Sequence, residues 1–150
     1  MCSSDLARCP LLPVFGHGRA LQQPVHVSDV AWAIAAVVDR PETHGEAFNI
    51  SGAAPLTFNA VVAQTAAALG RRAWTIHLPL APAVAVLQLA ERLGLRLPLR
   101  AEQLLRLNEP KAFDHGPARE LLGYQPLPFA EGIAREVALW RGGPDRPRGR

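Results

Sequence analysis

Short β-prone runs alternate with longer amphipathic runs along this chain, and this order constrains the fold more than any other feature. Three strands are predicted, over residues 24–27, 47–50 and 73–78, and helical segments follow them. Alternating strands and helices are typical of parallel βαβ units. The sequence therefore predicts an α/β fold with a parallel sheet, although three strands are too few for a complete doubly wound sheet.

Helical spacing and capping residues give the helices. Ser28 and Asp29 form an N-cap pair for a helix that ends before Pro41, and Asp29 is predicted to be its structural cap. Thr57 caps a helix through Leu69, and a left-handed Gly70 ends it. Further helical segments are predicted over residues 82–93, 101–107, 117–122 and 129–140. Residues 11–23, rich in Pro and Gly, are predicted to be a loop.

Composition divides the chain into three parts. Residues 1–10 show no periodicity and are predicted to be a non-native or disordered start, followed by a folded part over residues 11–140. Residues 141–150 hold four Arg and one Asp, a net charge of +3 that equals the net charge of the whole chain. The remainder is neutral, so we expect a disordered basic tail and no nucleic-acid-binding groove.

Other functional classes lack their signals. The two cysteines, Cys2 and Cys9, form no disulfide framework, and no Cys/His spacing indicates a metal site. The most apolar stretch, residues 78–99, is interrupted by charges and prolines, which argues against a membrane span. With no signal peptide at the start, a cytoplasmic location is the default expectation.

Several segments, in order, resemble one known family. Residues 23–31 (QPVHVSDVA) are similar to a strand-to-helix signature written H-V-x-D-V-A, and residues 48–52 (FNISG) to the strand and turn that follow it. Residues 57–70, 111–126 and 129–133 are similar to that family's later helices and its A-R-x-x-L-G-Y-x-P segment. The family is the extended short-chain dehydrogenase/reductases of the NAD-dependent epimerase/dehydratase type, and the resemblance is to its C-terminal portion.

The resemblance covers roughly residues 11–140 and implies the last strands of a partial Rossmann-type sheet plus a small, mostly helical substrate lobe. It implies that the complete protein uses NAD or NADP to transfer a hydride to or from a small-molecule substrate. That substrate would be a sugar, a steroid or another hydroxyl or carbonyl compound. A homodimer of the full-length protein is a further expectation, while substrate identity and the choice between NAD and NADP stay open.

The family's two signature sites are not found in this sequence. No Gly-x-x-Gly-x-x-Gly follows a strand, and Gly16 and Gly18 form only a Gly-His-Gly in the predicted loop. The catalytic Tyr-x-x-x-Lys needs a lysine one helical turn after the tyrosine, but the only lysine, Lys111, precedes the only tyrosine, Tyr124, by thirteen positions. We therefore assign no catalytic, cofactor-binding or metal-ligating residue, and expect the chain alone to be inactive.

Four residues are candidates for the substrate cleft: Arg19, Gln22, His26 and His77. Nucleotide-sugar members of the family place an arginine four residues before the signature histidine, where it contacts a substrate phosphate. Gln22 stands there instead, which puts a UDP-sugar substrate in doubt, although Arg19 could reach the same place. For each of these residues a structural or solvated role is the competing interpretation, and for His26 it is the favoured one.

Two other functions stay open. The complete protein could be a non-catalytic NAD(P)-sensing or assembly subunit with the same fold. Alternatively, residues 11–140 could be a small independent binding module that folds by itself.

Overall fold

The computed structural model describes residues 11–38, 40–95 and 100–142. Their elements, in chain order, are β1 (Leu11–Phe15), β2 (Leu21–Gln22), α2 (Val27–Val38), the 3-10 helix η1 (Pro41–Thr43), β3 (Leu56–Thr57), α3 (Phe58–Ala68), β4 (Trp74–Leu78), α4 (Leu80–Arg92), α5 (Ala101–Leu107), α6 (Gly116–Leu122) and α7 (Phe129–Gly142). The predictions for residues 1–10 and 143–150 lie outside the described residues.

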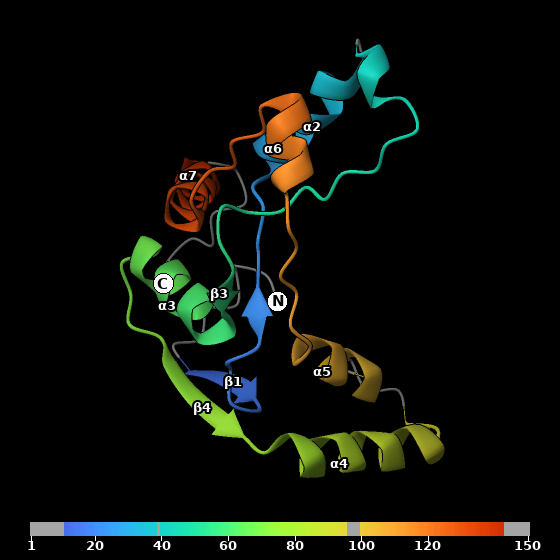
Figure 1. Ribbon diagram of the computed structural model, residues 1–150. Coiled ribbons are helices and arrows are strands. Elements are labelled where there is room, and N and C mark those ends of the chain that lie inside the picture. The colour runs from blue at the N-terminus through green and yellow to red at the C-terminus, as the bar shows by residue number, and fades with distance from the viewer. Residues whose placement is uncertain (1–10, 39, 96–99, 143–150) are drawn as a thin grey trace.

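The strands form two small sheets. β1 runs parallel to β4, from the pair Leu11 and Trp74 to the pair Phe15 and Leu78, while β2 pairs antiparallel with β3. Figure 1 shows α4 and α5 at the β4 end of the molecule, α2 and α6 at the opposite end, and α3 and α7 between them. The predicted α/β class with a parallel strand pair is confirmed.

Helix α3 follows its sequence signals closely. The Thr57 Oγ accepts a hydrogen bond from the Ala60 N–H (3.2 Å), and Gly70 beyond the helix has φ +66°. The guanidinium of Arg141 on α7 donates to the Leu69 carbonyl (2.8 Å) and so satisfies an acceptor at the helix end. Side-chain caps at both ends fix the position of α3, and the prediction for this helix is confirmed.

The predicted loop over residues 11–23 is wrong, because it contains β1 and β2. Leu12 and Val14 of β1 are buried, whereas Leu11 and Pro13 are exposed, which is the alternation of a half-buried strand. Proline is tolerated because a strand in a two-stranded sheet is an edge strand, whose backbone donors are not all needed.

The strands predicted over residues 24–27 and 47–50 do not form. A backbone hydrogen bond from the Gly52 N–H to the Gln23 carbonyl (3.4 Å) links the two regions, but no ladder develops among the described residues. Helix α2 begins at Val27, before the predicted N-cap pair, and uses the end of the first segment. A β-prone segment without a paired neighbour stays irregular.

Two hydrophobic clusters hold the structure together. The first, here called the Tyr124 core, joins α2 and α6 through Ala33, Ala118, Leu122 and Tyr124. The second, the β1 core, consists of Leu12 and Val14 from β1 with Val62 from α3. Among the described helices, none combines the length and apolarity needed to cross a membrane.

Candidate functional site

A tight turn follows β1 and positions the first candidate residues. Gly16 and Gly18 have φ values of +86° and +62°, a region that favours glycine, and the Gly16 N–H donates to the Leu78 carbonyl (2.8 Å). The turn therefore continues the β1–β4 ladder by one bond before the chain enters β2, which belongs to the other sheet.

Two asparagines hold this turn. A Cβ on Gly16 would lie 2.3 Å from the Asn108 Oδ1, and one on Gly18 would lie 2.0 Å from the Asn59 Oδ1. The Asn59 Nδ2 also donates to the His17 carbonyl (3.2 Å), and its backbone N–H donates to the Gly18 carbonyl (3.0 Å). The turn is clamped by side chains, so the glycines are needed for close approach as well as for their φ values.

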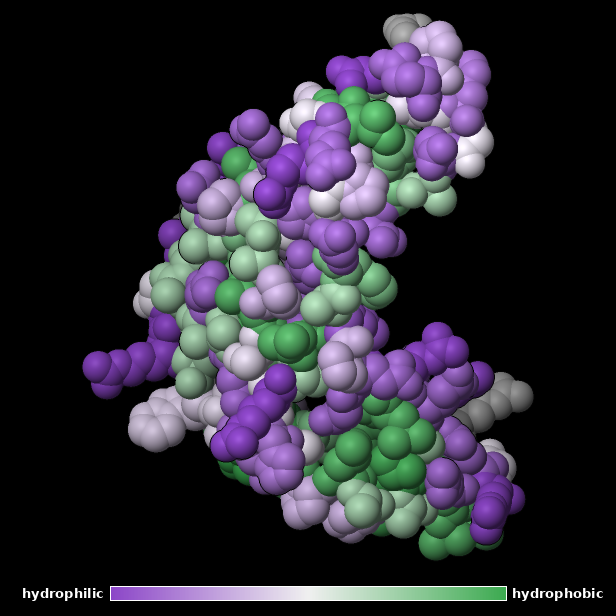
Figure 2. Space-filling model, viewed as in Figure 1, coloured by the Kyte–Doolittle hydropathy of each residue, from purple (hydrophilic) through white to green (hydrophobic). Residues whose placement is uncertain are grey.

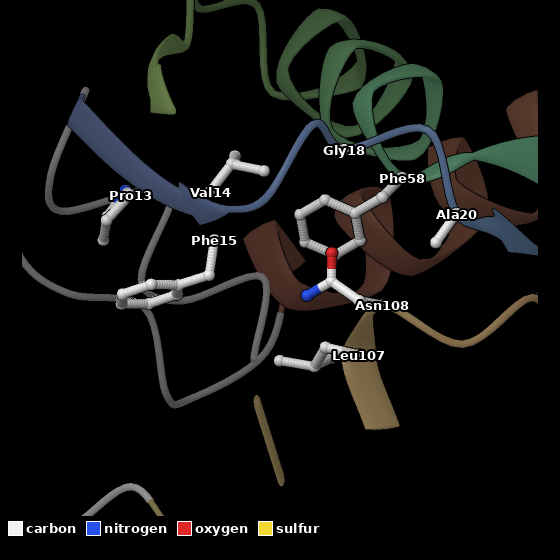
Figure 3. Close-up of a pocket in the computed structure, with 8 residues that line it drawn as sticks. All are labelled: Pro13, Val14, Phe15, Gly18, Ala20, Phe58, Leu107 and Asn108. Atoms are coloured by element: carbon white, nitrogen blue, oxygen red, sulfur yellow. The ribbon is translucent and has the colours of Figure 1, made fainter. Parts of the chain in front are cut away.

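A small cavity of about 20 Å³, room for about one water molecule, lies beside the turn, at the carboxyl end of β1. Figure 3 shows the Asn108 amide between the Phe58 ring and the Leu107 side chain. The other residues that line the cavity are Pro13, Val14, Phe15, Gly18 and Ala20. One amide and no charged side chain therefore face this cavity.

Three of the four predicted cleft residues gather around the turn. Arg19 is exposed within it, and the Gln22 Nε2 donates weakly to the Glu109 carbonyl (3.4 Å). His77, exposed on β4, has its Nε2 3.4 Å from the Asn59 Oδ1. None of these three residues lines the cavity.

His26 lies elsewhere, immediately before the first residue of α2. Its Nδ1 accepts from the Ser28 N–H (3.2 Å) and contacts the Ser28 Oγ (2.6 Å), so the imidazole serves as the N-terminal cap of this helix. Its Nε2 is buried and lies 3.2 Å from the Glu136 Oε1, without the geometry of a hydrogen bond. His26 and Glu136 form part of a larger groove, of about 370 Å³, between residues 24–27 and the start of α7.

The prediction that Asp29 caps α2 is wrong. Because the helix begins at Val27, three residues earlier than a cap at Asp29 would place it, Asp29 is already inside its first turn. Its Oδ2 accepts from the Leu127 N–H (2.9 Å), which ties α2 to the segment before α7. The negative charge still favours the helix N-terminus.

The Gly16–Gly18 turn does not fit a dinucleotide. A pyrophosphate-binding turn leads from a strand into a helix and leaves its glycine faces open to the ligand. Here the turn leads into β2, and the Asn59 and Asn108 side chains occupy the space over both glycines. Among the described residues, no cluster of three His, Cys, Asp or Glu side chains could hold a metal.

Sequence reasoning missed Asn59, Asn108 and the two phenylalanines of the cavity. Asn59 follows Thr57 by two residues and Asn108 ends α5, where asparagine is common for local reasons. Their contacts with the turn span 41 and 92 positions of sequence, from Gly18 to Asn59 and from Gly16 to Asn108. No local pattern in the sequence carries that information.

Comparison with known proteins identifies the fold. No family model matches the sequence, and no curated protein matches it. Solved structures do match. The dTDP-glucose 4,6-dehydratase DesIV from Streptomyces venezuelae, with NAD bound, has a TM-score of 0.65 at 23% identity, over 94% of this chain and 37% of the other.

Two further structures agree. The UDP-glucose 4-epimerase from Thermotoga maritima, with UDP-glucose, has a TM-score of 0.61 at 20% identity, over 87% of this chain and 35% of the other. RMD from Pseudomonas aeruginosa, complexed with NADPH, has a TM-score of 0.55 at 14% identity, over 94% of this chain and 38% of the other. The chain has the Rossmann-like α/β fold of epimerase/dehydratase structures. It spans little more than a third of their length.

Proposed function

We propose that this chain is the substrate-side part of an NAD(P)-dependent epimerase, dehydratase or reductase. In this proposal a different part of the complete protein binds NAD or NADP and supplies the proton donor. Residues 11–140 contribute the last strands of the sheet, part of the cleft and the small helical lobe. This chain alone does not catalyse the reaction.

The observation that carries the proposal is the pair of β-prone segments that lie together without forming a ladder. Gly52 packs so closely on residue 24 that a Cβ would lie 2.0 Å from the Pro24 carbonyl oxygen. The Gln23 side chain spans this junction, because its Nε2 donates to the Gly52 carbonyl (2.8 Å) and its Oε1 accepts from the Phe113 N–H (2.8 Å). Three distant segments are thereby fixed in place.

These clamped segments have the composition of buried parallel strands. Residues 25–27 and 48–50 are rich in β-branched and aromatic side chains, yet their backbones make no ladder with each other. Unpaired strand-forming segments are ready to join a sheet that another segment supplies. The structural neighbours, DesIV with NAD and RMD with NADPH, support a dinucleotide-binding sheet as that partner.

The cofactor belongs to that other part in this proposal. Neither the Gly16–Gly18 turn nor any other described turn offers open glycine faces at the start of a helix. The role of residues 11–140 is then to shape the space in which the substrate meets the cofactor. The substrate is a small hydroxyl or carbonyl compound, and a homodimer of the full-length protein remains a prediction.

Dinucleotide binding tests the proposal. NAD+ and NADPH are titrated by calorimetry against the 150-residue chain and against the longest product of the same reading frame. We expect binding by the longer product only, together with slower amide hydrogen exchange at Val25 and Ile50. Tight dinucleotide binding by the 150-residue chain would contradict the proposal, as would unchanged exchange at both amides in a longer product that binds the cofactor.

A further inference from the structure

The groove between residues 24–27 and the start of α7 has room for a small organic molecule. Its volume is about 370 Å³, and ligand pockets usually measure about 300–1,000 Å³. Seven of its ten lining residues are apolar, among them Val25 and Ile133, and one is glycine. The two polar lining residues are His26 and Glu136. Ligand sites combine an apolar wall with a few polar groups in the same way.

The imidazole of His26 is neutral in this arrangement. The Ser28 N–H can only donate, so the His26 Nδ1 accepts from it (3.2 Å) and the ring proton lies on Nε2. That Nε2–H is buried and lies 3.2 Å from the Glu136 Oε1, without the geometry of a hydrogen bond. The Glu136 carboxylate therefore faces a group that neither neutralises its charge nor forms a good hydrogen bond with it.

Glu136 has no cationic partner in the described part of the chain. Within residues 11–38, 40–95 and 100–142, the neutral His26 ring is its one ion-pair contact, and no lysine or arginine lines the groove. The Glu136 side chain is 47% exposed, so a ligand can reach it. An apolar groove with one negative charge is complementary to a hydrophobic molecule with one positive charge.

Two helices begin at this groove, and the charges at their N-termini also act on a ligand. The N-termini of α2 and α7 each carry a positive partial charge of about one half, which by itself favours anions. Asp29 and Glu131 lie in the first turns of these helices and offset the two partial charges. The charge of Glu136 remains, and Arg135 next to it in the sequence neither lines the groove nor pairs with it.

We propose that this groove binds a small hydrophobic amine, with its apolar body against Val25, Phe129 and Ile133 and its ammonium group on the Glu136 carboxylate. His26 contacts the Oε1 of Glu136, so Oε2 is the oxygen left for the ammonium group. The inference goes beyond the proposed function and does not depend on it. Strand pairing would use backbone groups of residues 24–27, whereas the groove uses their side chains.

Three ligands that share a phenylethyl group test the proposal. The 150-residue chain, labelled with 15N, is titrated at low ionic strength with 2-phenylethylamine, 2-phenylethanol and 3-phenylpropanoate, and amide shifts are followed by NMR. We expect the amine to shift the Val25, Ile133 and Glu136 amides and to bind about threefold more tightly than the alcohol, as an exposed charge pair allows. The amine should lose this advantage in about 0.5 M NaCl, and 3-phenylpropanoate should not bind.

The opposite results are equally clear. Equal affinity of the amine and the alcohol at low ionic strength would overturn the proposal. Tighter binding of 3-phenylpropanoate would overturn it too, and so would the absence of shifts at these amides with all three compounds.

Apolar surface elsewhere on the molecule provides an internal reference. Figure 2 shows hydrophobic residues gathered over α4 and α5, where Val86 and Leu89 are 65% and 59% exposed. A phenyl ring can bind there by apolar contact, without a preference for charge. Shifts of the Val86 and Leu89 amides should therefore be alike for the three compounds. An equal preference for the amine at these amides would show that the effect does not come from the groove.

Matched variants separate the charge from the fold. Glu136→Gln should make the amine and the alcohol bind equally, whereas Glu120→Gln, at an exposed site on α6, should preserve the preference. Val27→Lys places an ammonium group at the groove and should abolish amine binding, whereas Val38→Lys at the far end of α2 should not. Both valines are 69% exposed, so these chains should fold even if Glu136→Gln does not. An unchanged preference for the amine in a folded Glu136→Gln or Val27→Lys chain would overturn the proposal.

Discussion

The Tyr124 core and the β1 core are of similar size but are stabilised differently. Tyr124 is 1% exposed, its hydroxyl donates to the Ser51 carbonyl (3.0 Å), and its ring meets the His115 ring edge-on with centroids 5.8 Å apart. In the β1 core, Leu12, Val14 and Val62 make apolar contacts, and β4 beside them is exposed along its whole length.

Polar groups around Tyr124 form a continuous chain. The Arg119 guanidinium can only donate, so the His115 Nε2 (3.2 Å away) accepts and the proton lies on Nδ1. That Nδ1–H donates to the Ser51 Oγ (3.0 Å), which in turn donates to the Phe113 carbonyl (3.1 Å). Each buried polar atom of this chain has a partner, which rigidifies the Tyr124 core.

The difference separates a part of the fold that buried hydrogen bonds hold in place from a part that apolar contacts alone hold in place. Hydrogen bonds across the Tyr124 core tie together segments more than 60 positions apart, which fixes these segments relative to one another. The β1 core has fewer such constraints, and it is beside this core that the cavity lies. The following predictions test whether the two cores differ in this way.

The largest effect should come from emptying the Tyr124 core. Tyr124→Ala removes a buried ring and should lower the free energy of unfolding by about 3–5 kcal/mol. Val14→Ala in the β1 core should cost only about 2 kcal/mol, because fewer buried atoms are lost. Urea unfolding followed by tryptophan fluorescence measures both. Equal losses would show that the two cores contribute alike.

The next largest effect should be a loss of folding stability at alkaline pH, caused by ionisation of Tyr124. Burial, and then the negative charge of Asp29, raise the pKa of Tyr124 from 10.0 to about 12. The unfolded chain loses this proton near pH 10 while the folded chain keeps it, so stability should fall between pH 10 and pH 12, by about 2 kcal/mol.

Tyr124 is the only tyrosine of the chain, so tyrosinate absorbance reports it alone. Tyr124→Phe should remove this part of the pH dependence. Ionisation of the folded chain near pH 10 would show that the phenol is accessible to water.

A smaller effect is expected at the junction of the clamped segments. Gly52→Ala would bring a Cβ to 2.0 Å from the Pro24 oxygen, and the forced shift should cost about 1–2 kcal/mol. Gly142→Ala, where a Cβ meets nothing within 4 Å, is the matched control and should be neutral or slightly stabilising. Thermal unfolding of the two variants separates close packing from the general effect of replacing glycine.

The smallest effect should come from the open side of the β1–β4 sheet. Trp74 is 67% exposed, so Trp74→Thr should change the free energy of unfolding by less than about 0.5 kcal/mol. It should also reduce self-association at high concentration, because an exposed apolar strand face is removed. Sedimentation velocity measures the second effect, and a stability loss above 1 kcal/mol would place Trp74 in a packed core.

Local signals predicted some elements well. Thr57 and Gly70 gave α3, and the alternating run before Pro79 gave β4, because caps and strand periodicity act within a few residues. The alternation of strands and helices gave the α/β class, and the family resemblance gave the portion of the fold. The sequence did not reveal β1, because Pro13 and two nearby glycines resemble a loop until β4 is known to lie alongside.

The site was predicted less well for the same reason. Arg19, Gln22 and His77 were candidates for the substrate cleft, but the cavity is lined by other residues, among them Phe15, Phe58 and Asn108 from three distant elements. His26 caps α2 in place of Asp29, since the helix begins three residues earlier than predicted. That Asp29 accepts from the distant Leu127 N–H could not be foreseen. Contacts between segments far apart in the sequence determine which residues line the cavity and which residue caps α2.

The asparagine clamps on the Gly16–Gly18 turn have an evolutionary consequence. A larger residue at either glycine collides with its asparagine, while a shorter residue at position 59 or 108 leaves the turn without its support. A substitution of the glycine or of the asparagine alone therefore destabilises the turn. Homologous sequences should therefore show positions 16 with 108, and 18 with 59, changing together.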